Sequence, residues 1–290
     1  MGGDVGKFFE GAGRVVGGAL QAVGDFIQEA WNQFAPVPVK HGGSGNDTLY
    51  GYMPGNWLYG HGGNDTLVAF GAYNRLEGGA GNDNLSGLGI RNELIGGDGN
   101  DYLKGGGAWN LLDGGAGNDD IWGVAGWNDI QGGDGDDTLH GLGLVGNNIS
   151  GGAGNDTIYA IGAVNVVYGG SGNDTIWAIG VATRADGEDG NDQIVAVGAA
   201  TSVSGGAGDD RLVATGIVNL MRGGAGNDTL VGGGGSNFQF GDEGDDVLVG
   251  GGIANFQEGG SGDDTLAVSY THLRAHETKA NLVCRLLLEK

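Results

Sequence analysis

Residues 151–168 read GGAGNDTIYAIGAVNVVY, two halves of nine residues that differ at their sixth position. The first half carries an aspartate there, Asp156, and the second carries an asparagine, Asn165. Both halves are rich in small residues and place an apolar residue at the eighth position. A nine-residue unit in which only alternate copies are charged indicates a repeat with two different turns.

The charged half recurs between residues 42 and 267 approximately as G-G-x-G-(N/D)-D-x-(L/I)-x. Its aspartates lie 18 residues apart, except for one spacing of 19 between Asp137 and Asp156. They are Asp47, Asp65, Asp83, Asp101, Asp119, Asp137, Asp156, Asp174, Asp192, Asp210, Asp228, Asp246 and Asp264. So regular a spacing excludes chance, even in a chain with 69 glycines.

The uncharged half follows a second pattern, roughly (G/A)-x-G-x-x-N-x-φ-x, in which φ is usually apolar. Its asparagines are Asn56, Asn74, Asn92, Asn110, Asn128, Asn147, Asn165, Asn219, Asn237 and Asn255, with Thr183 and Thr201 in the same place in two repeats. The spacing is 19 from Asn128 to Asn147 and 18 from there to Asn165, so the inserted residue lies in 141–150.

These periods predict an all-β solenoid of about 13 coils, each with two short strands and two turns. The eighth positions predict a core made of Leu49, Leu67, Leu85, Leu103, Ile121, Leu139, Ile158, Ile176, Ile194, Leu212, Leu230, Leu248 and Leu266. The opposite strand supplies Leu58, Leu76, Leu94, Leu112, Ile130, Ile149 and Val167. Two large side chains per coil do not offset an ordering entropy of roughly 1–2 kcal/mol per residue, which leaves room for a stabilising ligand.

Calcium fits the charged turn best. Glycines allow several backbone carbonyls to face one point, and the aspartate adds an anionic oxygen. Calcium takes six to eight such oxygens in flexible geometry, whereas magnesium requires stricter octahedral geometry and zinc prefers His or Cys. One loop cannot supply all of these ligands, so we expect the ion to lie between loops of adjacent coils.

The motif GGAGNDTIY resembles the RTX (repeats-in-toxin, haemolysin-type calcium-binding) nonapeptide, over about 226 of the 290 residues. The resemblance implies a right-handed parallel β-roll. It also implies that the thirteen aspartates and the glycine-loop carbonyls bind Ca2+ between successive loops on one side. Many family members carry aspartates on both edges, whereas asparagine replaces them here on one edge, where amides can hydrogen-bond in a ladder without an ion. Thirteen loops on the other edge give about twelve shared sites.

Charge and composition exclude several classes of protein. The formal net charge of −23 argues against nucleic acid and anionic membranes as partners and favours a cation. No apolar run is long enough to span a membrane, and the N-terminus lacks the pattern of a cleaved signal peptide. Within 1–267 there is no GxSxG or HExxH motif, so we expect no catalysis, and His41, His61 and His140 are expected to be solvated.

Both ends of the chain depart from the repeat. Residues 268–290 lack glycine, contain the only cysteine, Cys284, and resemble a translated sequencing adapter, so we expect the natural chain to continue differently after 267. The domain organisation is then 1–40 as a helical cap and linker, 41–267 as the β-roll and 268–290 as a non-native tail. Apolar residues at spacings of three and four over residues 4–34 predict an amphipathic helix. It is expected to cap the open end of the solenoid, with a membrane or partner helix as the alternative.

The sequence therefore favours a secreted, extracellular bacterial module that folds on binding calcium. The resemblance implies export by type I secretion machinery. Two other functions stay open: an adhesin or rod that binds glycans or ice, and an accessory region of a truncated secreted enzyme or toxin. The threonine row at the seventh position and the aromatic residues Tyr50, Trp122, Tyr159 and Trp177 at the ninth would serve the first of these. Both rows are also ordinary strand-surface residues.

Overall fold

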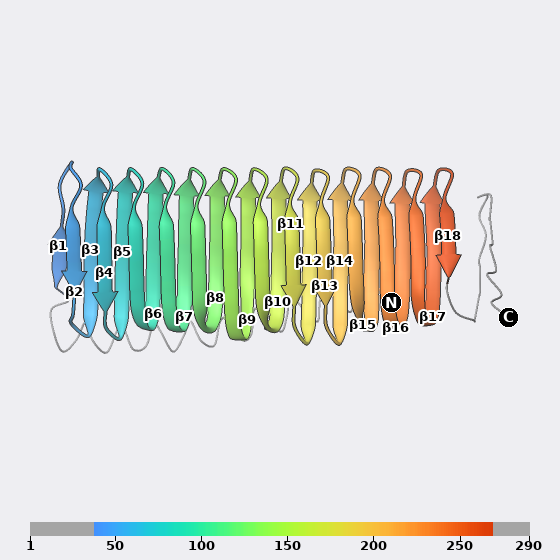
Figure 1. The fold of residues 1–290 in the computed structure, drawn as a ribbon, viewed down its shortest axis with the longest axis horizontal. Helices are drawn as coiled ribbons and strands as arrows, with labels where there is room; N and C mark the ends of the chain where they lie inside the picture. The colour runs from blue at the N-terminus through green and yellow to red at the C-terminus, as the bar shows by residue number, and fades with distance from the viewer. Residues whose placement is uncertain (1–37, 269–290) are drawn as a thin grey trace.

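The computed structural model describes residues 38–268, which wind into a parallel β-solenoid of about 13 turns (Figure 1). Its strands join one continuous sheet that wraps round the solenoid. This confirms the predicted all-β solenoid. The predicted N-terminal helix and the tail after residue 268 lie outside the described residues.

Some strands are short pieces that cover one side of a coil, and others are longer and run through two sides of a coil. They are β1 (Val39–His41), β2 (Thr48–Gly51), β3 (Gly55–Gly62), β4 (Thr66–Phe70), β5 (Tyr73–Ala80), β6 (Asn84–Asp98), β7 (Tyr102–Ala116), β8 (Asp120–Asp134), β9 (Thr138–Ala153), β10 (Thr157–Ser171), β11 (Thr175–Ile179), β12 (Ala182–Asp189), β13 (Gln193–Val197), β14 (Ala200–Ala207), β15 (Arg211–Ala225), β16 (Thr229–Glu243), β17 (Val247–Ser261) and β18 (Thr265–Val268).

Strand register follows the sequence period. Ile158 pairs with Ile176, 18 residues later, and the same offset holds between most neighbouring coils. Between β8 and β9 the register shifts, because Gly126 alone stands opposite both Leu144 and Val145. The structure thus places the inserted residue inside the predicted interval, where a bulge accommodates it without disturbing the next coil.

The two turns of each coil form two different edges of the solenoid. At the first, which we call the aspartate edge, a short loop such as Gly154–Asp156 separates β9 from β10. At the second, the asparagine edge, strands such as β10 bend across the turn without a break. In Figure 1 the aspartate edge is uppermost and the asparagine edge is below.

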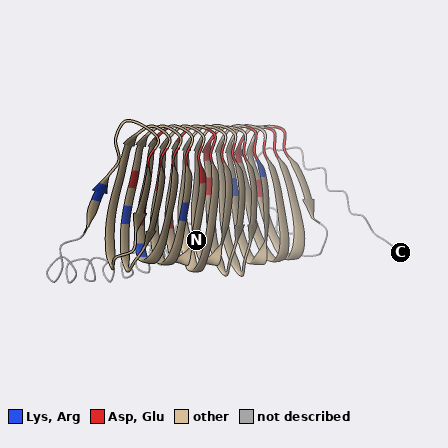
Figure 2. Ribbon diagram, turned by 60° about the vertical axis from the view of Figure 1, so that its left-hand side comes forward, with Lys and Arg blue, Asp and Glu red and all other residues tan. Residues whose placement is uncertain are grey.

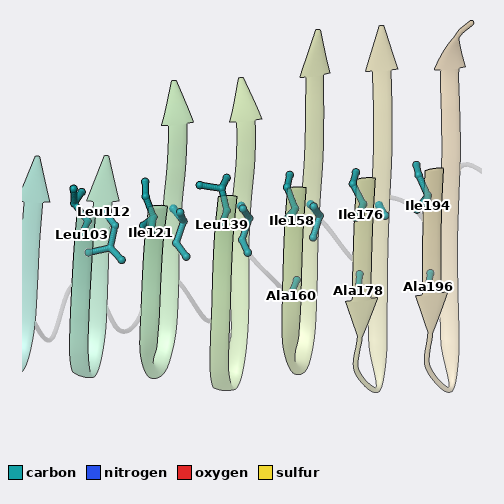
Figure 3. Packing of buried hydrophobic residues seen from close by; sticks show 14 of the residues in the cluster. Leu103, Leu112, Ile121, Leu139, Ile158, Ala160, Ile176, Ala178, Ile194 and Ala196 are labelled. Atoms are coloured by element: carbon teal, nitrogen blue, oxygen red, sulfur yellow. The ribbon is translucent and has the colours of Figure 1, made fainter. Parts of the chain in front are cut away.

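The core is a double row of aliphatic side chains between these edges. Residues such as Leu103 and Ile121 are fully buried and face Leu112 and its equivalents on the opposite wall (Figure 3). The predicted eighth-position residues all join this core. Leu49 and Leu266 are only partly buried, because each lies in a terminal coil.

The opposite wall changes character after the predicted Val167. It continues with Ala185, Val203, Met221 and the fully buried Gln239. The Gln239 amide donates to the carbonyl oxygens of Leu230 and Val249, at 2.9 and 3.1 Å. Its buried polar group is therefore satisfied by the backbone of the solenoid. The described part of the chain contains no helix of the length and hydrophobicity that a membrane crossing requires.

Candidate metal centres along the aspartate edge

The thirteen predicted aspartates line a single edge, one in each coil. Twelve of them, from Asp65 to Asp264, are only 1–6% exposed, whereas Asp47 in the first coil is half-buried. The 18-residue register stacks these side chains in one row, because each lies at the same point of its loop. Figure 2 shows the acidic residues gathered along this edge.

One oxygen of each buried carboxylate is used by the fold. The backbone N–H of Asp156 donates to Oδ1 of Asp174 at 2.7 Å, and Asp137 donates likewise to Asp156 at 2.8 Å. The same bond links every consecutive pair from Asp47 to Asp264. The aspartate ladder therefore couples each loop to the next through a charge-assisted hydrogen bond.

The second carboxylate oxygen has no hydrogen-bond partner. Buried Oδ2 atoms without a partner are those of Asp65, Asp83, Asp101, Asp119, Asp137, Asp156, Asp174, Asp192, Asp210, Asp228, Asp246 and Asp264. An unpartnered buried polar atom is rare in folded proteins, and one that carries negative charge is costly unless a cation or donor compensates it. A row of twelve such oxygens at a fixed spacing points to a repeated ligand.

The surroundings of these oxygens are built from backbone. A Cβ added to Gly151, the first glycine of its loop, would lie 2.1 Å from Oδ2 of Asp156 and 2.4 Å from the carbonyl oxygen of Gly169. The first glycine of every loop has an equivalent close approach to its own aspartate. Only glycine fits here, and the carboxylate of one coil shares this space with a carbonyl of the next.

This donor set fits calcium. Carboxylate and carbonyl oxygens are the hard ligands that calcium prefers, and two adjacent loops contribute both kinds. Within residues 38–268 no three His, Cys, Asp or Glu side chains cluster as a metal site, so carbonyls have to complete any coordination shell. The loop glycines at positive φ, such as Gly152 and Gly154 at 120° and 131°, turn their peptide groups as such a shell requires.

Burial raises the pKa of ten carboxyl groups in the row, one in each coil from Asp83 to Asp246. Desolvation is the largest cause and neighbouring carboxylates add to it in most of the row, while the hydrogen bond from the preceding coil acts in the opposite direction. The pKa rises to about 7 for Asp101, Asp137, Asp174, Asp210 and Asp228, and to about 6 for Asp119, Asp156 and Asp192. Without a cation, the folded row therefore resists full ionisation near neutral pH.

A second ladder runs along the outside of the same loops. The fifth residue of each loop, asparagine or aspartate, accepts a hydrogen bond from the corresponding backbone N–H of the following coil. The N–H of Asn173, for example, donates to Oδ1 of Asn155 at 2.9 Å. This ladder runs in the opposite direction to the buried one, so each loop is held from both sides.

The asparagine edge satisfies most of its polar groups without a ligand, the exceptions being the Thr183 hydroxyl and the Asn255 amide nitrogen. The Asn147 amide donates to Oδ1 of Asn165 at 2.8 Å, and the links continue back to Asn56. The ladder stops at Thr183, whose buried hydroxyl has no partner, and resumes where Thr201 donates to Asn219 at 2.7 Å. Amide side chains both donate and accept hydrogen bonds, so neighbours in this row can satisfy one another. Carboxylates only accept, so neighbours in the other row cannot.

Three of the four aromatic residues predicted at the ninth position join one stack, whereas Tyr50 is exposed and stacks on Tyr52. Trp122, His140, Tyr159 and Trp177 lie ring on ring, with centroids 3.8, 4.9 and 4.8 Å apart. The rings of this stack therefore pack against their neighbours in adjacent coils, as expected for strand-surface residues. The expectation that His140 is solvated is wrong: it is half-buried between Trp122 and Tyr159, and desolvation lowers its pKa.

A comparison with known protein families identifies the same repeat. The family model for the RTX calcium-binding nonapeptide repeat (4 copies) matches residues 41–67, 71–89, 86–121, 122–143, 145–176, 204–239 and 222–252, which together are more than half of the chain. A comparison with curated proteins finds no significant match.

Proposed function

Because the chain belongs to the RTX calcium-binding nonapeptide-repeat family, we propose that residues 41–267 are a module that folds with calcium along its aspartate edge only. The observation that carries the proposal is the row of twelve buried Oδ2 atoms without a hydrogen-bond partner. Each would contribute to an ion held between its own loop and a neighbouring one. This arrangement gives about twelve sites, as the sequence predicts.

Different groups of the chain have different roles in such a site. Oδ1 of each aspartate holds the adjacent loop through the backbone, so Oδ2 stays in place for the ion. Gly151 and Gly169 and their equivalents keep the space clear of side chains and bring a carbonyl oxygen to it. A bound calcium ion supplies the positive charge that offsets the buried carboxylates.

Folding is then coupled to the ion. The calcium-free row places like charges in successive coils with little solvent, which opposes winding. Ions that bind only the wound chain stabilise it by mass action. We propose that the chain is unwound where calcium is scarce, that it crosses a type I secretion channel in that state, and that it winds outside the cell.

The role that follows is a spacer or presenting module without catalysis of its own. An adhesive rod that binds glycans or ice, and an accessory region of a secreted enzyme or toxin, are the alternatives. In the stack of Trp122, His140, Tyr159 and Trp177 the rings face each other, which does not favour sugar binding on ring faces there.

The test is far-UV circular dichroism of the full chain during separate titrations with calcium and magnesium. We expect a transition to β-structure with calcium at about 0.1–1 mM, the range of extracellular sites, and a much weaker response to magnesium. A chain that has full β-structure in chelator at neutral pH, and does not respond to calcium, would contradict the coupling of folding to the ion.

A further inference from the structure

The asparagine edge carries a second feature, a strip of exposed apolar side chains. Five or six residues precede the asparagine or threonine of each coil, from 51–55 in the first coil to 250–254 in the twelfth. We call these twelve segments the apolar strip. Large apolar side chains project from it, among them Leu144, Ile253 and Ile217 at 89%, 80% and 68% exposure.

The strip is almost free of charge in a strongly acidic chain. Its segments contain no Asp, Glu or Lys, and their single charged residue is Arg91. The Arg91 guanidinium lies over the rings of Trp109 and Tyr73, at 4.3 and 5.4 Å, and the residue is 7% exposed. Figure 2 shows the contrast, with acidic residues gathered along one edge and none along the opposite edge.

An apolar surface of this extent calls for a covering partner. Parallel strands lie about 4.8 Å apart, so twelve successive coils form a strip about 53 Å long. Soluble proteins rarely expose continuous apolar patches above a few hundred Å2 unless something binds them. Apolar residues at scattered turn positions are common, but here Tyr52, Leu88, Val181 and their equivalents recur in nearly every coil.

The described part of the chain begins at this edge. Val39 pairs with Trp57, which directly follows the first segment of the strip and Asn56, and the Trp57 N–H donates to the Pro38 carbonyl oxygen at 3.2 Å. Residues 1–37 therefore lead into the solenoid at the N-terminal end of the apolar strip. They are the nearest available covering by position in the chain.

The sequence of that segment matches the strip in length and pattern. Its apolar stripe recurs at spacings of three and four, and includes Val16, Phe26 and Phe34. A helix over residues 4–34 would be about 46 Å long at 1.5 Å per residue, close to the length of the strip. A helix that only capped the open end would have no need of this length, since one coil is much shorter.

We propose that residues 4–34 form an amphipathic helix that lies along the apolar strip, starting at the first coil and reaching toward the last. Phe34, Phe26, Val16 and Phe9 would then contact coils about two to three apart along the strip, and the charged residues of the segment would face solvent. In this proposal the helix covers the asparagine edge instead of capping the open end of the solenoid. It does not depend on where calcium binds.

Site-directed cross-linking of the full chain tests this arrangement, with Cys284→Ser removing the native thiol. Val16 lies 18 residues before Phe34, about 27 Å or roughly six coils along the strip. We therefore pair Val16→Cys with Ile161→Cys, which is exposed on the strip in the seventh coil. The matched control pairs Val16→Cys with Ser171→Cys, exposed on the aspartate edge of the eighth coil. Both are treated with a short bis-maleimide in calcium.

The expected result is an intramolecular cross-link for V16C/I161C at least tenfold more efficient than for V16C/S171C. Adding Phe9→Glu and Phe26→Glu should abolish it while circular dichroism shows the solenoid intact. Cross-links between chains would assign the strip to a second copy, and would overturn the proposal. Free reaction of both cysteines with a monofunctional maleimide, without any cross-link, would overturn it as well.

Discussion

The aspartate edge and the asparagine edge share one 18-residue period but complete their polar groups differently. On the asparagine edge, Asn147 both accepts from Asn128 and donates to Asn165. On the aspartate edge, Asp156 accepts at Oδ1 and leaves Oδ2 without a partner. The exchange of an amide for a carboxylate thus leaves a buried oxygen without a partner, as the proposed cation sites require.

The glycines follow the same division. Every loop of the aspartate edge begins with glycine, whereas the corresponding position of the asparagine edge holds alanine in several coils, such as Ala160 and Ala214. The aspartate edge therefore tolerates no side chain next to its carboxylate, while the asparagine edge accepts a methyl group. The difference agrees with the proposal that a ligand fixes the geometry of the aspartate edge.

Acid should remove most of the difference in charge between the two edges of the calcium-free protein. This is the largest effect we expect. The pKa of Asp101, for example, is about 7 in the folded chain against 3.8 without the fold, so the folded state takes up protons as pH falls from about 7 to about 4. The free energy of unfolding must then rise as pH falls over this range. In chelator, circular dichroism should show more β-structure at pH 5 than at pH 7.5.

Calcium should reverse this dependence of stability on pH. Ions require ionised carboxylates, so protonation competes with binding and the calcium midpoint should move to higher concentration at pH 5. A calcium-free chain that is equally ordered at both pH values would show that the buried carboxylates do not oppose folding.

In chelator, exchanging single residues between the edges should give effects of opposite sign. Asp156→Asn removes a buried charge, so it should stabilise the chain in chelator and weaken it in calcium, where a ligand is lost. Asn147→Asp leaves Asn165 and the Ile161 carbonyl without their donor and buries a charge. That should destabilise the chain by about 3–5 kcal/mol in either condition.

Hydrogen exchange of the coils flanking each substitution measures these effects locally. If Asp156→Asn lowered protection in chelator as much as in calcium, the carboxylate would act through its ladder bond alone.

A glycine-to-alanine substitution should destabilise the two edges by different amounts, because the added methyl group meets different neighbours. Gly151→Ala places Cβ against a backbone carbonyl and Asp156, and overpacking of this kind costs about 1–3 kcal/mol. Gly123→Ala meets only the Asn128 side chain, at 2.6 Å, and the coil with Ala160 and Asn165 already accommodates that pair. Its effect should stay below about 1 kcal/mol. Urea unfolding of both variants in calcium makes the comparison, and equal losses would contradict the special role of the aspartate edge.

The sequence predicts what depends on the period alone. Because 18 residues fix the register, the core rows and the alignment of residues such as Asp156 and Asp174 follow directly. The direction of each side-chain hydrogen bond could not be predicted, since it depends on the stagger between coils. Nor could the apolar strip, because residues such as Leu144 and Ile217 occupy variable positions of the turn. Gln239 interrupts the apolar pattern of the core. Its burial is explained only by its hydrogen bonds to neighbouring carbonyl oxygens, which the sequence does not show.

The smallest effect we expect comes from mending the asparagine ladder at its gap. Thr183 is fully buried with an unpartnered hydroxyl, so the Asn165 amide finds its partners in backbone carbonyls instead. Thr183→Asn should restore an amide acceptor for Asn165, as Asn165 itself provides for Asn147. Room for it is indicated by the Ala160 coil, which combines alanine and asparagine as Ala178 and the new amide would.

One restored buried hydrogen bond contributes about 0.5–1.5 kcal/mol, so Thr183→Asn should stabilise the coils around residue 183 by that amount. Since the asparagine edge holds no ion in our proposal, the gain should be the same at low and high calcium. Thr157→Asn, on the strand surface, is the control and should change little. Hydrogen exchange near residue 183 reads out both variants. A gain seen only in calcium would mean that the two edges are coupled rather than independent.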